Sequence, residues 1–276
     1  MIEVSECLSY GLLPHGWREI RKIDAHMHVN GGPHQWGWGD NTDAIEAADA
    51  LGIDQMCCSI PITGGRLATP DEVRAANDAV LEAMRRWPDR ILGYCFVMPG
   101  YRDESLEEID RCVDAGMIGI KLYNQYKYSD PVLFPIAEKS IEIGVPILGH
   151  AGHCTDAASR SAQPNISDAA DFRELALRYP NATLIEGHIG GGGDWEWSVK
   201  MLRDCPNVYL DTSGSGVDDR LIEMCIAELG HRRLLFATDM TMEGGVGKIL
   251  SAEMTDEQRE DIFWRNMQQI LDGRMV

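Results

Sequence analysis

Short apolar segments alternate with longer amphipathic segments along nearly the whole chain. The short segments are rich in Ile, Val and Leu, as in "VPILGH" and "RLLFATD". The longer segments repeat their apolar residues at spacings of three and four, as in "DESLEEIDRCVDAG". The first pattern is typical of buried strands and the second of amphipathic helices. The sequence therefore predicts regular alternation of strand and helix.

Eight strands and eight helices follow from this pattern. The predicted strands cover residues 22–29, 54–61, 91–99, 118–123, 145–150, 182–188, 208–213 and 233–239. The predicted helices cover residues 42–52, 69–88, 103–116, 131–144, 167–180, 194–206, 217–230 and 255–271. Several helices begin at Ser, Thr or Asp and end at Gly or before Pro, which are common boundary residues.

Strands that alternate with helices are parallel, because the helix returns the chain to the same edge of the sheet. Eight such units predict a (β/α)8 TIM barrel. A length of 276 residues suits one domain over residues 1–276, with residues 1–20 as a lead-in that covers one barrel end. The alternative, an open doubly wound sheet, calls for a glycine-rich phosphate turn after the first strand. Here that strand ends in histidines instead.

The composition of the chain argues against several classes of binding partner. A net charge of -19 disfavours nucleic acid and anionic membrane surfaces. The chain has no stretch of 18 apolar residues, and its start lacks the basic and apolar regions of a signal peptide. Its eight cysteines form no C-x-x-C pair, and several lie in apolar strands as small buried side chains. We therefore expect a cytoplasmic protein with reduced cysteines, a small-molecule substrate and no membrane segment.

Potential metal ligands occur where predicted strands end. In a TIM barrel the loops after the strands converge on one site. His26 and His28 end the first strand and share a face by the two-residue period, together with Asp24. The fifth, sixth and eighth strands end at His150, His188 and Asp239. A single histidine at such a position is more often a hydrogen-bonded structural residue than a ligand, but four of the chain's eight histidines share this placement.

These side chains suit one divalent metal ion. Imidazole nitrogen and carboxylate oxygen are donors for zinc, with manganese and iron as alternatives. If His26, His28, His150 and Asp239 bind the metal, His188 is left near its open position. His188 is then a candidate general acid or base, and Asp239 a candidate for holding the attacking water.

Five segments in order resemble the amidohydrolase superfamily: "IDAHMH", "PILGHAG", "EGHIGG", "LLFATDM" and "IFWRNMQQIL". The chain is most similar to the amidohydrolase-related (amidohydrolase-2) branch, which includes relatives of the carboxymuconate-semialdehyde and resorcylate decarboxylases. The resemblance spans residues 23 to about 271. It implies that His26, His28, His150 and Asp239 bind a single metal ion. It also implies that His188 acts on water or substrate.

Lys121 on the fourth strand needs an interpretation of its own. In other branches of the superfamily a lysine here is carbamylated and bridges two metal ions, but relatives of the decarboxylase type do not need a second metal. We expect one metal, with Lys121 facing a substrate carboxylate. The alternative is an ion pair inside the barrel, with Glu186 as the candidate partner, because a buried lysine needs one. Tyr123 and Trp36 are expected to contact substrate, although Trp36 equally suits a cap over the barrel.

The expected reaction is hydrolysis of an ester, lactone or amide in a small, carboxylate-bearing substrate by metal-activated water. The alternative is non-oxidative decarboxylation of an unsaturated or aromatic acid at the same site. A barrel metallonuclease is disfavoured by Lys121, where such enzymes have a glutamate, and by the negative charge. A barrel that only binds a ligand is a further alternative. Relatives are often dimers, so a homodimer is left open.

Overall fold

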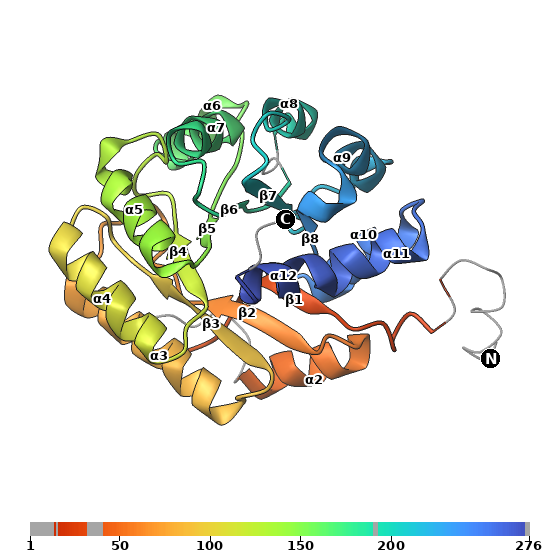
Figure 1. Ribbon diagram of the computed structural model, residues 1–276, viewed down its shortest axis with the longest axis horizontal. Helices are drawn as coiled ribbons and strands as arrows, with labels where there is room; N and C mark the ends of the chain where they lie inside the picture. Colours follow the sequence, from red (N-terminus) through yellow and green to blue (C-terminus); the bar gives the residue numbers. More distant parts are fainter. Residues whose placement is uncertain (1–13, 15, 32–40, 190–192, 274–276) are drawn as a thin grey trace.

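Eight parallel strands form a barrel with helices packed around it (Figure 1). The computed structural model describes residues 14, 16–31, 41–189 and 193–273. Each strand pairs with the next one along the chain, in the order β1 to β8. Their bounds are β1 (Ile23–His28), β2 (Gln55–Ser59), β3 (Ile91–Phe96), β4 (Gly119–Leu122), β5 (Ile147–Gly149), β6 (Leu184–Glu186), β7 (Val208–Asp211) and β8 (Leu234–Leu235). The predicted (β/α)8 TIM barrel is confirmed.

The barrel closes along a seam between β1 and the chain at and after β8. The backbone N–H of Ala25 donates to the carbonyl of Phe236 at 2.8 Å, and the N–H of Asp239 donates to the carbonyl of His26 at 2.8 Å. The Asp24 carboxylate accepts hydrogen bonds from the hydroxyl and backbone N–H of Thr238. The first and last strands are therefore joined by both backbone and side-chain bonds.

Helices cover the outside of the strands. Their bounds are α2 (Asn41–Leu51), α3 (Pro70–Arg86), α4 (Arg102–Asp114), α5 (Phe134–Ile143), α6 (Ala157–Ala162), α7 (Ala169–Arg178), α8 (Trp195–Met201), α9 (Leu221–Leu229), α10 (Met242–Ser251), α11 (Asp256–Glu260) and α12 (Asn266–Leu271). Short 3₁₀ helices occupy Pro131–Leu133 and His231–Arg233, and a π-helix at Asp261–Arg265 joins α11 to α12. Each predicted helix is present, and α6 and α10 are additional. Thr69, Asp168 and Thr255 start α3, α7 and α11 with capping boxes.

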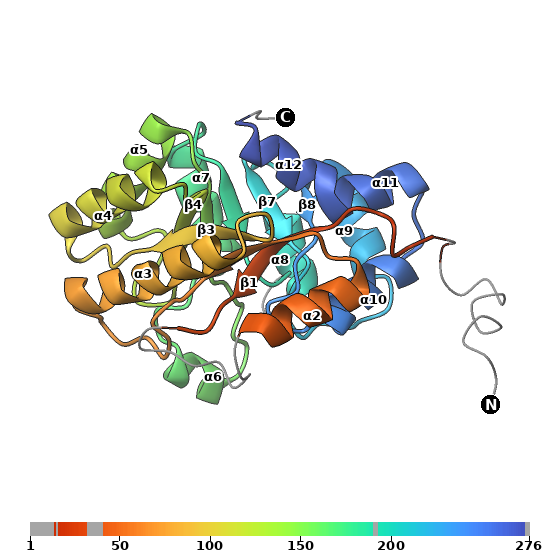
Figure 2. The same cartoon turned by 90° about the horizontal axis from the view of Figure 1, so that it is seen from below.

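The core has two layers. Inside the barrel, Ile23, Cys57 and Leu148 pack with other inward-facing strand residues and with Met267 and Ile270 of α12. A second layer fills the space between the strands and the surrounding helices. The contact between α12 and the inner layer closes the end of the barrel where the strands begin. Figure 2 shows α12 and α6 on opposite sides of the barrel, so α6 marks the carboxyl end of the strands.

Three further expectations concern single features. The lead-in expected over residues 1–20 lies mostly outside the described residues. Within the described part of the chain the seven cysteines form no disulfide. No helix there combines the length and apolar character needed to cross a membrane.

Candidate metal centre

His26 and His28 reach the carboxyl end of the barrel from an irregular strand. The pairing of β1 with β2 shifts register between Asp24 and Met27, so strict alternation is broken there. Both histidines are buried, with 1% and 4% of their surface exposed. Asp24 does not join them, because its carboxylate is held by Thr238 and by the backbone N–H of His26.

Asp239 lies between three imidazoles. Its Oδ1 is 3.0 Å from Nε2 of His28 and 3.8 Å from Nε2 of His26, and its Oδ2 is 3.1 Å from Nε2 of His188. Burial alone would raise the pKa of the Asp239 carboxyl. The surrounding imidazoles outweigh that effect and hold the pKa well below its usual range. Asp239 is therefore a carboxylate anion at the centre of the cluster.

The backbone at two of these residues is unusual. His188 has φ 66° and Asp239 has φ 44°, both in the left-handed region that residues other than glycine rarely adopt. The backbone N–H of His188 donates to Asp211 Oδ1 at 2.8 Å, and that of Asp239 donates to His26. These bonds hold the strained conformations, which turn both side chains toward the cluster.

Each of the three imidazoles around Asp239 is oriented by a contact at its Nδ1 atom. Nδ1 of His26 lies 2.8 Å from Asp211 Oδ2, Nδ1 of His28 lies 3.1 Å from the Ser59 carbonyl, and Nδ1 of His188 lies 3.1 Å from the Ala151 carbonyl. Carbonyl and carboxylate oxygens only accept hydrogen bonds, so each Nδ1 carries the hydrogen. The Ser59 hydroxyl, 3.3 Å from Nδ1 of His28, adds a second contact there.

The hydrogens on Nδ1 leave lone pairs on the three Nε2 atoms, and these lone pairs meet the Asp239 carboxylate. Acceptor atoms at such distances need a cation between them, either a proton on an imidazole or a metal ion. One atom each from His26, His28 and Asp239 lies within 4.8 Å of the other two. Histidines held by a carboxylate or carbonyl on the far nitrogen are typical metal ligands. The residues present thus fit a divalent ion.

Asp211 at the end of β7 is the contributor that the sequence analysis missed. Its Oδ2 contacts His26, while Oδ1 accepts from His188 N–H and from the Ser213 hydroxyl and N–H. Burial opposes its charge, but His26 and its other donors lower the pKa well below the usual value. The sequence feature that could have identified Asp211 is its position at a strand end, a position that Asp239 shares.

His188 differs from His26 and His150 in the direction of its pKa shift. Burial opposes its charged form, but the hydrogen bond and charge of Asp239 outweigh burial and raise the pKa of His188. The pKa of His26 is lowered to about 4 by burial and by the charge of Lys121. His26 is thus held neutral, as a ligand must be, while His188 retains a proton more readily.

Lys121 lies inside the cluster and contacts His26. Its Nζ is 2.7 Å from Nε2 of His26, and the side chain is fully buried. Burial lowers the pKa of Lys121 to about 8, with Asp239 and Asp211 acting in the opposite direction. Glu186 is not its partner, since both carboxylate oxygens of Glu186 are buried without a hydrogen bond in the described structure. The pairing considered for Lys121 and Glu186 is wrong.

His150 lies at the edge of the cluster. Its ring stacks on Tyr123 with centroids 4.1 Å apart and meets the His188 ring at 4.7 Å. Its Nε2 faces Gln163 Oε1 at 3.4 Å, and it is not part of the compact group formed by His26, His28 and Asp239. Trp36, the third expected substrate contact, lies outside the described residues.

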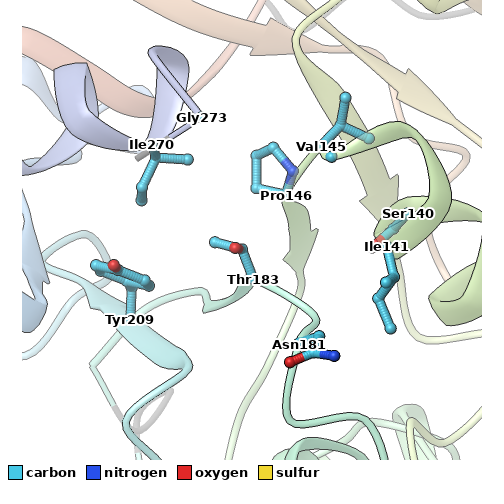
Figure 3. A pocket seen from close by; sticks show the side chains of 10 residues that line it. Ser140, Ile141, Val145, Pro146, Asn181, Thr183, Tyr209, Ile270 and Gly273 are labelled. Atoms are coloured by element: carbon cyan, nitrogen blue, oxygen red, sulfur yellow. The ribbon is translucent and has the colours of Figure 1, made fainter. Parts of the chain in front are cut away.

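A cavity of about 470 Å³ opens beside the cluster. Asp239, His188 and His150 line its floor, and residues of the loops after β5 and β7 form its walls. A smaller cavity of about 170 Å³ lies at the opposite end of the barrel, where α5, α12 and the starts of β5 and β6 meet (Figure 3). Among the described residues that line the smaller cavity, Tyr209 alone has an ionisable side chain. Of these two cavities, the one at the carboxyl end is therefore the one that borders charged groups.

The chain is similar in sequence and in fold to proteins that have been characterised. Over 252 residues the chain is 27% identical to gamma-resorcylate decarboxylase of Rhizobium radiobacter, covering 72% of this chain and 76% of the relative. The crystal structure of 2,6-dihydroxybenzoate decarboxylase from Rhizobium superposes with a TM-score of 0.71 at 19% identity, covering 91% and 98% of the two chains. A dihydroxybenzoic acid decarboxylase from Polaromonas sp. JS666, with bound manganese and 2-nitroresorcinol, gives 0.71 at 20% identity, covering 91% and 96%.

A family model covers almost the whole barrel. Residues 23–272 match the model Amidohydro_2, described as amidohydrolase. The match begins at the first residue of β1 and ends just after α12, so it contains every candidate ligand. This chain belongs to the Amidohydro_2 family of amidohydrolases.

Proposed function

We propose that the protein is a non-oxidative decarboxylase of a hydroxylated aromatic carboxylic acid, dependent on one divalent metal ion. The observation that carries this proposal is the set of imidazole Nε2 atoms directed at the Asp239 carboxylate, in a chain similar to gamma-resorcylate decarboxylase. The sequence analysis ranked hydrolysis first and decarboxylation second. The relatives named above favour the reverse order, since each of them carries the name of a decarboxylase.

The proposed metal ligands are His26, His28, His150 and Asp239. A bound divalent ion supplies a Lewis acid for carboxylate and hydroxyl oxygens of a substrate. The manganese in the Polaromonas structure makes Mn²⁺ the first ion to test, alongside the Zn²⁺ favoured by the sequence analysis. A second metal is not part of the proposal, because Nζ of Lys121 is directed at His26.

His188 is the proposed proton donor. The ring carbon that bears the carboxylate receives a proton from Nε2 of His188, and the bond to the carboxylate carbon then breaks as CO₂ leaves. The electron pair of that bond restores the aromatic ring, so no oxidant or reductant is needed. The raised pKa of His188 keeps a proton available, and the Ala151 carbonyl holds its ring in place.

The polar groups of the cavity support a substrate with one carboxylate. No Lys or Arg belongs to the described residues that line the larger cavity, whereas Ser159, Ser215 and Thr241 supply hydroxyl groups and Asp156 a negative charge. The substrate carboxylate would therefore bind at the metal centre beside Lys121, with Tyr123 as a wall. The uncharged, hydroxyl-bearing part of the substrate would face the loops.

The test is an assay of the purified protein loaded with Mn²⁺ or Zn²⁺. We expect CO₂ release from 2,6-dihydroxybenzoate or a related hydroxybenzoate, measured together with loss of the aromatic acid. His188→Asn should keep the metal and lose turnover by several powers of ten, while His26→Ala and Asp239→Ala should lose the metal. Turnover of lactones or amides without any CO₂ release would reject decarboxylation in favour of hydrolysis. The homodimer and the cytoplasmic location stay predictions.

A further inference from the structure

A row of hydrogen bonds connects three loops to the ring of His150. The backbone N–H of Gly65 donates to Asn124 Oδ1 at 3.1 Å, and Asn124 Nδ2 donates to Gln163 Oε1 at 2.7 Å. The same Gln163 oxygen lies 3.4 Å from Nε2 of His150. These residues belong to the loops that follow β2, β4 and β5. We call Gly65, Asn124 and Gln163 the amide relay.

The first donor in the relay determines every later atom. A backbone N–H can only donate, so the Asn124 atom that faces Gly65 is its oxygen, and its amide nitrogen faces Gln163. That nitrogen can only donate, so the Gln163 atom between Asn124 and His150 is an oxygen. An amide oxygen can only accept, so Nε2 of His150 carries a hydrogen. A neutral imidazole has one N–H, and the lone pair of His150 is therefore on Nδ1.

Local structure holds the relay in place. Gly64 and Gly65 have φ of 71° and 66°, a left-handed turn that favours glycine and directs the Gly65 N–H at Asn124. Asn124 is 2% exposed, so its amide group bonds to fixed protein partners and not to water. The face of the His150 ring is covered by Tyr123, leaving the ring edge for Gln163 on one side.

A histidine that binds a metal ion does so as the neutral imidazole. The His150 ring lies beside the cluster around Asp239, with its centroid 4.7 Å from that of the His188 ring.

We propose that Asn124 and Gln163 are positioning residues that hold His150 in the tautomer with hydrogen on Nε2 and so keep the Nδ1 lone pair available to a metal ion. The tautomer is independent of the proposed function, whereas the use of Nδ1 as a metal ligand rests on it. Far-side partners of this kind change metal affinity by roughly 10- to 100-fold when they are replaced.

The first experiment needs only the wild-type protein without metal. Long-range ¹H–¹⁵N correlation spectra of protein labelled with ¹⁵N-histidine distinguish the two tautomers, and the His150 signals are those missing from His150→Gln. We expect His150 with a protonated Nε2 and an unprotonated Nδ1. A protonated Nδ1 overturns the proposal without reference to any activity.

Asn124→Asp tests the relay at a distance from the ring. The introduced carboxylate accepts from Gly65 but cannot donate to Gln163, so the Gln163 amide turns and offers its nitrogen to both neighbours. Nε2 of His150 then accepts, which moves the hydrogen to Nδ1. We expect reversal of the tautomer in the spectrum and a 10- to 100-fold loss of Mn²⁺ affinity by calorimetry. A folded variant with the original tautomer, or with unchanged Mn²⁺ affinity, overturns the positioning role.

Asn165→Asp is the matched control. Asn165 lies in the same loop as Gln163, and its Nδ2 donates to the Gln125 carbonyl at 2.9 Å, outside the relay. The same change of chemistry there should leave the His150 tautomer and the Mn²⁺ affinity as they are in the wild type. If Asn124→Asp does not fold, Gln163→Met removes the acceptor directly, and a mixture of both tautomers is expected. A wild-type tautomer in Gln163→Met overturns the proposal, while Mn²⁺ binding without decarboxylation counts against the proposed function alone.

Discussion

Lys22 and Lys121 are two buried lysines near opposite ends of the barrel, and they are alike in burial and in pKa but differ in their partners. Both are fully buried, and burial lowers the pKa of each to about 8. Nζ of Lys22 donates to the carbonyls of Trp17 and Ile20 at 2.8 Å and to that of Gly52 at 3.3 Å. Nζ of Lys121 contacts Nε2 of His26 among the groups of the metal centre.

The difference shows that burial and pKa do not by themselves indicate function. The ammonium group of Lys22 has three hydrogens and three fixed carbonyl acceptors, so its bonds tie the start of β1 to neighbouring loops. Among the described residues, Lys121 has a single hydrogen-bond partner, His26, which is a candidate metal ligand. We therefore expect loss of Lys22 to cost stability and loss of Lys121 to cost activity.

The largest effect expected from this comparison is on catalysis by Lys121→Met. Removal of one buried cationic donor at a reacting site lowers kcat/KM by roughly 10²- to 10³-fold. The free energy of unfolding should change by less than about 1 kcal/mol, because the cost of burying the ammonium offsets its single contact. Steady-state decarboxylation and urea unfolding measure the two quantities. Full activity in Lys121→Met would remove the distinction between the lysines.

Lys22→Met should show the opposite pattern. Three buried or partly buried carbonyls lose their donor, which lowers the free energy of unfolding by roughly 2–4 kcal/mol. The kcat and KM of the folded enzyme should stay at the wild-type values. Chemical denaturation and kinetics at a temperature well below the unfolding transition test both expectations. A loss of kcat in folded Lys22→Met would contradict them.

The effect of Mn²⁺ should also differ between variants of the two lysines. A saturating ligand at 100 times its Kd stabilises the native state by about 2.7 kcal/mol. Mn²⁺ should stabilise the wild type and Lys22→Met equally, whereas His28→Ala should gain nothing. Lys121→Met should bind Mn²⁺ roughly tenfold more tightly, since Nζ no longer competes for Nε2 of His26. Weaker binding would mean that Lys121 helps to hold the metal.

The smallest effect is a pH dependence of stability caused by Lys22. The unfolded chain keeps this proton up to the ordinary lysine pKa of 10.5, whereas the folded chain releases it near 8. Between those values the unfolded state binds more protons, so a rise in pH favours the folded state at this residue. The stability deficit of Lys22→Met should accordingly grow between about pH 8 and pH 10.5. A deficit that shrinks over that interval has the wrong sign.

The strands could be predicted better at their starts than at their ends. All eight follow from apolar patterning, but β8 ends at Leu235 and β6 at Glu186, short of the predicted ends at Asp239 and His188. Both of the latter residues take left-handed backbone conformations, which leave the strand ladder. Helix α10 was missed because Gly244, Gly245 and Gly247 have low helix propensity. Its apolar face packs on the core and supplies the missing stability.

The candidate ligands could be recognised in the sequence by their residue types and by their positions at strand ends. The orientation of their side chains could not be predicted. His26, His28 and Asp239 come together as expected, and His188 contacts the same carboxylate. Asp24 and Asp211 are both strand carboxylates, yet only Asp211 reaches a histidine ring of the centre. The irregularity in β1 that turns Asp24 toward Thr238 depends on pairing with β2, which a residue pattern does not contain.

The seam of the barrel also determines at which stage of chain synthesis the metal centre can form. His26 and His28 come from the first strand, whereas Asp239 is supplied by the chain beyond the last one. Two of the three compact ligands are therefore synthesised more than two hundred residues before the third. Contacts between such distant positions form late, because a long loop must first be closed. A nascent chain cannot assemble this centre until the last strand of the barrel has been made, and a metal ion bound across the seam would hold the first and last strands together.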